Sequence, residues 1–299
     1  MQTATSHLVE NPIKTLYPTQ NAYPENPLPT HHKLPQHQYR FSGNPNNKPK
    51  PLSPTEATCL LQTADFSIHL VNSFKQRVKA STLIKRMYAA RGYQTENTSV
   101  FSESSNQYTF EARNTEQLLG TLTLTIDSDN GLLADQLYRN EINAFRKEGK
   151  TVCEVSKLAF TPNTSSKSIF SALFHVAYLH ARFLHDVEAA FIEINPRHVR
   201  FYKNTLGFTQ IGEQRTCPRV DAPAILLSLD LNHMGDQILQ HVDAALPESK
   251  ERSIYSYFFS SRIANQVFNK IIQIHSATRP SHNETRHPAR TFQTRSKWD

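Results

Sequence analysis

The chain has 299 residues, a formal net charge of +7 and an isoelectric point near 9.3. Its three cysteines, Cys59, Cys153 and Cys217, are an odd number without CxxC spacing, which argues against a disulfide framework or a zinc site and favours a reducing, cytoplasmic location. The amino terminus lacks a charged start followed by an apolar run, and no stretch has the roughly 18 consecutive apolar residues of a membrane helix, so neither a signal peptide nor a membrane span is expected.

The two ends of the chain differ in composition from the middle. Residues 1–55 are rich in Pro, His and Asn and show no apolar period, and residues 276–299 are polar and basic. Such segments bury too little apolar surface to offset the entropy of ordering, so both are predicted to be disordered tails. The predicted domain spans residues 60–231, and a helical extension is expected over residues 232–275.

Short stretches that are apolar, or in which apolar and polar residues alternate, recur through the middle of the chain and are typical of β-strands. The predicted strands are residues 65–71, 107–113, 119–127, 151–160, 187–194, 208–215 and 223–231. The predicted helices, from apolar residues at helical spacing, are residues 74–91, 135–148, 166–185 and 197–205. This order predicts an α/β (α+β) fold with a mixed, mostly antiparallel sheet and helices on both of its faces.

Two further helices are predicted after the last strand, at residues 233–245 and 251–274. The second carries a broad apolar stripe that includes Ile254, Phe258 and Phe268 and needs a surface to cover it. Packing against the domain, capping an acyl tunnel and peripheral contact with a membrane would each satisfy that need.

The most distinctive string is FYKNTLGF at residues 201–208, between a buried strand and the next strand. It resembles the fourth-helix signature of the GNAT superfamily, in which an aromatic pair precedes a helix-ending glycine and a phenylalanine. Together with LIKRMYAARGY at residues 83–93 and EVSKLA at residues 154–159, it also resembles the long-chain N-acyl amino acid synthases. The resemblance covers about residues 65–231. It implies a GNAT-type acyltransferase fold, related to that of acyl-homoserine-lactone synthases, and transfer of a fatty acyl group from acyl carrier protein to an amino acid.

Attack of an amine on a thioester needs a base for the amine, a site for the oxyanion and a proton for the leaving thiolate. Glu154 lies among apolar residues of its strand, where burial would raise its pKa and suit a general base; the alternative is that it holds substrate or pairs with a neighbouring base. Tyr202 occupies the position at which the resemblance implies a general acid, and packing beneath the helix is its alternative role. The backbone amides from Ser156 to Leu158 are expected to receive the oxyanion.

The resemblance also implies a set of substrate-binding positions. These are Arg86, Tyr88, Ser156, Lys157, Asn195 and Phe201. Lys157 is expected to bind the acceptor carboxylate or the acyl carbonyl as a point charge. Acyl-homoserine-lactone synthases have arginine where this chain has Ile84 and Lys157, so lactone synthesis from S-adenosylmethionine is not expected.

The loop after the strand at residues 151–160 lacks the glycine-rich motif with which acetyl-CoA-dependent relatives cradle a pyrophosphate. Ser165, Ser166, Lys167 and Ser168 begin the following helix and are predicted to hold one phosphate. One phosphate suits the phosphopantetheine arm of acyl carrier protein better than coenzyme A, although acyl-CoA stays an alternative donor. No permanently bound cofactor and no metal are expected.

The helix within residues 74–93 is strongly basic. Its basic residues are Lys75, Arg77, Lys79, Lys85, Arg86 and Arg91, with no acidic residue between them. Acyl carrier proteins are acidic, so this helix is predicted to be their docking surface, with a merely solvated face as the alternative. Aromatic interleaving and a recognition-helix pattern are missing from it, so nucleic-acid binding is not expected.

Three functions fit the sequence. The first is an N-acyltransferase that moves a fatty acyl group from acyl carrier protein to the amino group of an amino acid. The second is an acetyl-CoA-dependent N-acetyltransferase of a small molecule or protein, and the third is a non-catalytic GNAT-like binding module.

Overall fold

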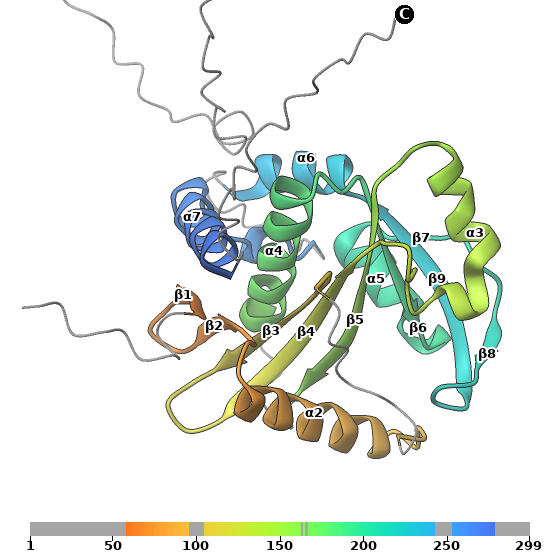
Figure 1. Ribbon diagram of the computed structural model, residues 1–299, viewed down its shortest axis with the longest axis horizontal. Helices are drawn as coiled ribbons and strands as arrows, with labels where there is room; N and C mark the ends of the chain where they lie inside the picture. The colour runs from red at the N-terminus through yellow and green to blue at the C-terminus, as the bar shows by residue number, and fades with distance from the viewer. Residues whose placement is uncertain (1–57, 96–104, 163, 165–166, 243–252, 279–299) are drawn as a thin grey trace, which may run out of the picture.

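The computed structural model describes residues 58–95, 105–162, 164, 167–242 and 253–278 (Figure 1). The predicted tail at residues 1–55 lies outside the described residues. So does most of the tail predicted at residues 276–299, whose first three residues belong to a helix. No helix in the described part of the chain has the length and apolar character needed to cross a membrane.

The centre of the fold is one twisted sheet (Figure 1). Its strands are β1 (Cys59–Gln62), β2 (Ser67–Leu70), β3 (Gln107–Arg113), β4 (Leu118–Ile126), β5 (Val152–Phe160), β6 (Ala189–Ile194), β7 (Thr209–Gln210), β8 (Arg215–Cys217) and β9 (Ala222–Asp230). The strand order is β1-β2-β3-β4-β5-β6-β9-β7, and β8 pairs with β9. Neighbouring strands are antiparallel except β5 and β6, which are parallel.

Helices cover both faces of this sheet. They are α2 (Phe74–Ala89), α3 (Asp135–Lys147), α4 (Lys167–Leu184), α5 (Val199–Leu206), α6 (Leu231–Val242) and α7 (Ser261–Thr278), with short 3-10 turns η2 (Pro196–His198) and η3 (Tyr255–Tyr257). The main apolar core joins one face of the sheet to α4, α5, α6 and α7, and two smaller clusters join the other face to α2 and α3. The predicted mixed, mostly antiparallel sheet with helices on both faces is therefore confirmed.

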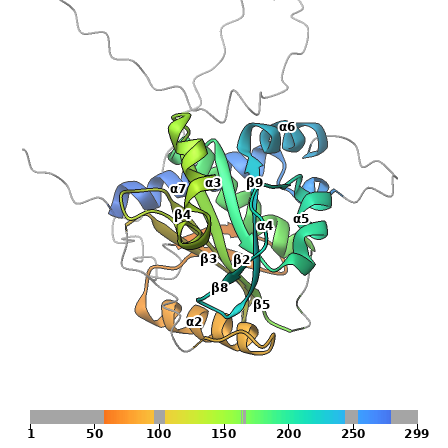
Figure 2. The same cartoon turned by 90° about the vertical axis from the view of Figure 1, so that its right-hand side faces the viewer.

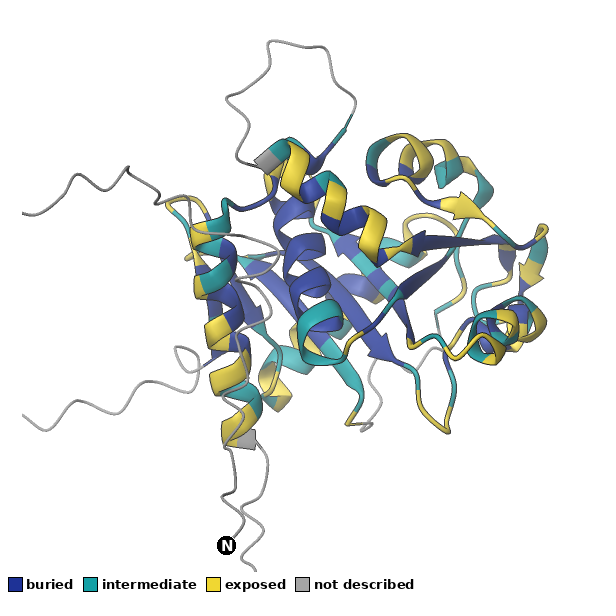
Figure 3. Ribbon diagram, turned by 90° about the horizontal axis from the view of Figure 1, so that it is seen from above, coloured by how far each residue is buried: buried dark blue, intermediate teal, exposed yellow. Residues whose placement is uncertain are grey.

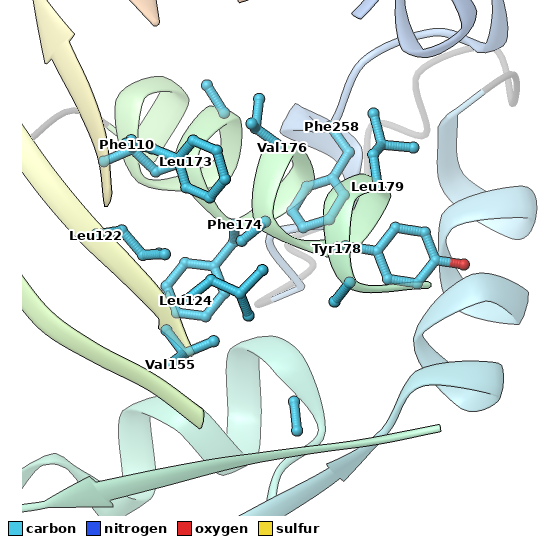
Figure 4. Close-up of a cluster of buried hydrophobic side chains, with 14 of the residues drawn as sticks. Phe110, Leu122, Leu124, Val155, Leu173, Phe174, Val176, Tyr178, Leu179 and Phe258 are labelled. Atoms are coloured by element: carbon cyan, nitrogen blue, oxygen red, sulfur yellow. The ribbon is translucent and has the colours of Figure 1, made fainter. Parts of the chain in front are cut away.

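The helix α4 is the centre of the larger core and is buried along most of its length (Figure 3). Its apolar side chains meet Phe110, Leu122 and Val155 of the sheet on one side and Phe258 on the other (Figure 4). A helix that is apolar around most of its surface needs cover on all sides. The carboxyl-terminal segment supplies the outer cover, since α7 packs on α4 away from the sheet (Figure 1).

The prediction of one helix over residues 251–274 is wrong for its first half. The chain there forms the turn η3, then an extended residue at Phe258 with ψ of 163°, and α7 begins only at Ser261. The break has a tertiary cause, because the backbone amide of Phe259 donates to Nδ1 of His175 on α4 at 2.9 Å. The rings of Phe258 and Phe259 stack on the same imidazole, with centroids 4.7 and 4.6 Å away. Of the three roles considered for the apolar stripe, packing against the domain is the one observed.

The strand predicted at residues 208–215 is also too long. Only Thr209 and Gln210 pair in β7, and the amides of Ile211 and Gly212 both donate to the carbonyl of Leu226. A Cβ atom at Gly212 would lie 2.6 Å from the ring of Tyr138, so the chain turns here at a glycine that lets α3 approach closely. The structure also contains β1, a four-residue strand that the sequence pattern does not predict.

Candidate active site

The strands β5 and β6 separate in the middle of the sheet. Their parallel pairing runs from Val152 opposite Ala189 to Glu154 opposite Phe191, and no pairs follow among the described residues. Beyond this point β5 pairs only with β4, and β6 continues against β9 to Ile194. An opening therefore begins beside Glu154, and residues on either strand beyond it lie at its rim.

A bulge in β5 lies at the same level. Ser156 is opposite Thr123 and Ala159 is opposite Thr121, so β5 has one residue more than β4 between these pairs. Lys157 takes up the difference with φ of +53°, a backbone conformation that is uncommon outside glycine. The amides from Ser156 to Leu158, expected to receive the oxyanion, thus lie where the regular ladder is interrupted.

Glu154 is buried on the face of the sheet that α3 covers, with 2% of its surface exposed. Its Oε2 accepts a hydrogen bond from the backbone amide of Ala134 at 3.0 Å, just before α3. That amide is held in place because Asp135 accepts from the amide of Leu132 and from Arg146. Burial raises the pKa of Glu154 to about 7, and this carboxyl group therefore exchanges a proton readily near neutral pH.

A partly buried ion pair from two other elements faces Glu154 across the opening. Arg219, in the turn between β8 and β9, donates to Oε1 of Glu193 on β6 at 2.6 Å, and also to the carbonyl of Leu133. The thiol of Cys217 lies near the same pair, and its pKa rises to about 11 through burial and the neighbouring Glu193 carboxylate. Glu193 and Arg219 are not predicted from the sequence, although Glu193 shows the same signal as Glu154, a lone carboxylate in an apolar strand.

Lys157 and Tyr88, both predicted to bind substrate, belong to this cluster. Lys157 is 9% exposed, and burial lowers its pKa to about 8 against the opposing effect of the Glu154 carboxylate. Tyr88, near the end of α2, has its pKa raised to about 12 by burial and by Tyr93, with which it forms an edge-to-face pair. Arg197, at the start of η2, donates to the hydroxyl of Tyr93 at 3.0 Å, which ties the end of α2 to the far side of the opening.

Tyr202 projects from α5 into the same region. It is 9% exposed and packs edge-on against Phe208 and at an angle to Phe174. Burial, with a smaller effect of Tyr88, raises the pKa of Tyr202 above its usual range. The phenol is therefore protonated at physiological pH and can donate a hydrogen bond or a proton.

A small apolar cavity lies on the opposite face of the sheet, between β5, β6 and α4. Its volume is about 20 Å³, enough for roughly one water molecule. Cys153 and Val155 line it from β5, Phe174 from α4 and Phe208 from the segment after α5. Leu231 and Met234 of α6 also line it, so the carboxyl-terminal extension contributes to this cavity.

The remaining predicted substrate positions lie outside the buried cluster. Arg86 is exposed on α2, and Phe201 is 44% exposed on α5, where its ring packs edge-on against Phe170 and Tyr202. Asn195 has a structural role, since its Oδ1 accepts from the amide of Arg197 and caps η2.

The predicted phosphate site is described only in part. Ser165 and Ser166 lie outside the described residues. Lys167 and Ser168 are exposed in the first turn of α4, and the ammonium of Lys167 lies 5.5 Å from the ring centre of Tyr257. In the described part of the chain, no group of His, Cys, Asp or Glu has the arrangement of a metal site.

Comparison with known proteins identifies the family. The chain matches the family model described as N-acyl amino acid synthase FeeM over residues 79–230. It is similar to the solved structure of FeeM, an N-acyl amino acid synthase from uncultured soil microbes, with 32% identity and a TM-score of 0.53 over 56% of this chain and 92% of that chain. No curated protein matches it.

Two further solved structures align at lower identity. One is an acyl-CoA N-acyltransferase from Pseudomonas aeruginosa, with 13% identity and a TM-score of 0.41 over 55% of this chain and 97% of that chain. The other is the AHL synthase LasI, with 14% identity and a TM-score of 0.42 over 62% of this chain and 98% of that chain. The family match and the likeness to FeeM confirm the resemblance found in the sequence, and the chain belongs to the FeeM family of N-acyl amino acid synthases and is an N-acyltransferase.

Proposed function

We propose that this enzyme transfers a fatty acyl group from the phosphopantetheine arm of acyl carrier protein to the α-amino group of an amino acid. The observation that carries the proposal is the arrangement around the opening between β5 and β6. Glu154, with a pKa of about 7, lies on one face of the sheet, and the apolar cavity lies on the other. A thioester held in the opening would direct its alkyl chain toward the apolar side chains around the cavity and its carbonyl carbon toward the carboxylate side.

The groups around the opening account for each proton of the reaction. Glu154 takes a proton from the acceptor ammonium, and the freed amine forms the C–N bond to the thioester carbonyl carbon. The amides of the bulge at Lys157 stabilise the oxyanion. When the C–S bond breaks, the phenol of Tyr202 donates a proton to the departing thiolate and recovers one from Glu154 by way of solvent. The nitrogen of the new amide loses its remaining extra proton to Glu154, which is then ionised again, and Glu154 releases this proton to solvent. The products are an N-acyl amino acid and a free thiol.

The donor is inferred from charge and from the phosphate loop. The helix α2 exposes Lys75, Lys79 and Arg86 along one stripe, beside the exposed side chains of Phe74 and Val78. A basic surface with apolar side chains in it suits an acidic carrier protein whose contact helix is amphipathic. The loop before α4 has no glycine for a pyrophosphate, so we infer that acyl carrier protein is preferred to acyl-CoA. Cysteines that are free in the described chain suit a cytoplasmic location.

The direct test is an assay of the purified enzyme with thioesters of different acyl length and carrier. Acetyl, octanoyl, lauroyl and palmitoyl groups are offered on acyl carrier protein and on coenzyme A, with each of the twenty standard amino acids as acceptor. Mass spectrometry should detect N-acyl amino acids with long acyl groups and a higher kcat/KM for the carrier-bound donor. Turnover with acetyl-CoA alone would replace this proposal by the N-acetyltransferase alternative.

We expect Tyr202→Phe to lower kcat by about 10- to 100-fold, at the lower end for general acid catalysis because a thiolate is a good leaving group. The substitution removes only the hydroxyl and keeps the ring contacts with Phe174 and Phe208. Tyr255→Phe is the matched control, since this buried tyrosine donates to the carbonyl of Leu206 away from the opening. Equal rates for the two variants would leave Tyr202 with a packing role only.

We expect Met234→Ala to shift the products toward longer acyl chains. Met234 is 2% exposed and lines the cavity, and removing its flexible side chain enlarges the available space. One methylene in an apolar pocket changes the preference by about 10-fold or more, which competition between two acyl donors measures. Ile238→Ala is the control, because Ile238 is fully buried on the same helix but does not line the cavity. An identical shift in both variants would contradict the role assigned to the cavity.

A further inference from the structure

Glu193 carries a buried carboxylate oxygen that the folded chain does not satisfy. Its Oε1 accepts from Arg219 at 2.6 Å, whereas Oε2 has no hydrogen-bond partner among the described residues. The side chain is 7% exposed. A buried carboxylate oxygen without a donor costs free energy, so its retention calls for an explanation such as a ligand that supplies the donor.

The position of Glu193 identifies the region that such a ligand would occupy. Phe191 is the last residue of β6 that pairs with β5, and it lies opposite Glu154. Glu193 follows Phe191 by two residues on the same strand. Side chains two apart on a strand share a face, so Glu193 and Glu154 lie on the same face at the rim of the opening. The hydroxyl of Ser156, two residues beyond Glu154 on β5, is a second buried polar group without a hydrogen-bond partner in the described chain. Two unsatisfied polar atoms therefore lie on the two strands that separate.

The charges around this point balance. Two carboxylates, Glu154 and Glu193, face two cations, Lys157 and Arg219. Glu154 interacts electrostatically with each of the other three groups. A ligand with a net charge would upset this balance, whereas a zwitterion preserves it. A free amino acid is such a ligand, with an ammonium group for the carboxylates and a carboxylate for Lys157.

We propose that Oε2 of Glu193 accepts a hydrogen bond from the α-ammonium group of the acceptor amino acid and positions it beside Glu154. This assignment rests on the proposed function and adds the residue that selects a cationic amine. Arg219 anchors Glu193 from the other side. Glu154 then removes one proton from the ammonium, and the resulting amine keeps a hydrogen-bond contact with Glu193 through a remaining N–H while its lone pair forms the C–N bond. Glu193 takes no proton in this sequence, so it is a binding and positioning residue.

The test compares Glu193→Gln and Glu193→Asp with the wild-type enzyme, using the standard amino acid that the wild type acylates fastest. We expect Glu193→Gln to raise the KM for the amino acid by about 10- to 100-fold with a smaller effect on kcat, as for a lost hydrogen bond to a charged group. Glu193→Asp should recover part of the loss. The acid limb of the rate profile should also move to lower pH, because Glu193 contributes to the raised pKa of Glu154.

A matched control separates ligand binding from structural support. Glu141→Gln removes the carboxylate of a similar pair, Glu141 with Arg215 at 2.5 Å, which joins α3 to β8 away from Glu154. An equal rise of KM in the Glu141 and Glu193 variants, or an unchanged KM in Glu193→Gln with an unmoved acid limb, would overturn the assignment. If the wild type acylates none of the twenty amino acids, the proposed function itself fails, which is a different outcome.

A second measurement needs no variant at Glu193. The deamino analogue of the best acceptor keeps its carboxylate and side chain but lacks the ammonium group. Inhibition of the acylation reaction by this analogue tests whether the ammonium contributes to binding. We expect the analogue to inhibit with a constant at least about 10-fold above the acceptor's KM. Inhibition by the analogue at or below that KM would overturn the assignment even if Glu193→Gln does not fold.

Discussion

Glu154→Gln is expected to lower kcat by about 10²- to 10⁴-fold at neutral pH, the range typical of a lost general base. The amide keeps an oxygen for the hydrogen bond from Ala134 and has nearly the same volume, so the fold should be retained. A neutral amide at this buried position accepts no proton from the acceptor ammonium. The measurement is steady-state turnover with saturating acyl carrier protein thioester and amino acid.

Glu111→Gln supplies the control for this variant. Glu111 is also a buried glutamate of the sheet, 2% exposed, and burial raises its pKa, but it lies on β3 and accepts from Gln76 rather than facing the opening. Its substitution should leave turnover close to the wild-type value. A loss of the same size in both variants would show that the effect reflects sheet stability and not proton transfer.

The same assignment predicts the pH profile of the wild-type enzyme. Glu154 is active only when ionised, so kcat/KM should rise as pH increases through about 7. Lys157 binds a carboxylate only when protonated, so acceptor binding should weaken as pH increases through about 8. Since the two groups interact, the observed limbs belong to the cluster. In Glu154→Gln the acid limb should disappear.

Reversing the charge of the basic stripe on α2 is expected to have the second large effect. The triple variant Lys75→Glu, Lys79→Glu and Arg86→Glu should lower kcat/KM for acyl carrier protein by about 10- to 10³-fold at low salt, because electrostatic steering contributes gains of this size. All three side chains are exposed, and α2 lies at the lower end of the sheet in both side views, opposite α6 (Figures 1 and 2). The remaining activity should depend little on ionic strength.

Two comparisons make this result specific. Turnover of the same variant with an acyl-CoA donor should fall much less, since Glu154, Lys157 and Tyr202 are unaltered. The control triple Arg139→Glu, Lys147→Glu and Lys203→Glu changes the net charge equally on exposed positions of α3 and α5. If it lowers carrier-protein turnover as much as the α2 triple does, the effect comes from net charge and α2 is not the docking surface.

Local patterns were sufficient to predict part of the candidate site. Glu154 is conspicuous as one carboxylate within an apolar strand, and Tyr202 lies in a signature that also contains the helix-ending Gly207. Both properties depend on a few neighbouring residues and so are visible in the sequence. Arg219 had no such signal, because it lies in a turn and meets Glu193 only after β9 has returned beside β6.

The sequence by itself determined the order of elements, the GNAT-type resemblance and the acid–base pair to be tested, because strand alternation, helical spacing and a short signature are all local properties. Only the tertiary structure decided where β5 and β6 separate, that Glu193 and Arg219 join Glu154, and that α6 lines the apolar cavity. It also decided that the predicted final helix is broken, since His175 on α4 binds the amide of Phe259 across 84 residues of chain. These features depend on contacts between residues far apart in the chain, and no local pattern encodes the distance between such residues.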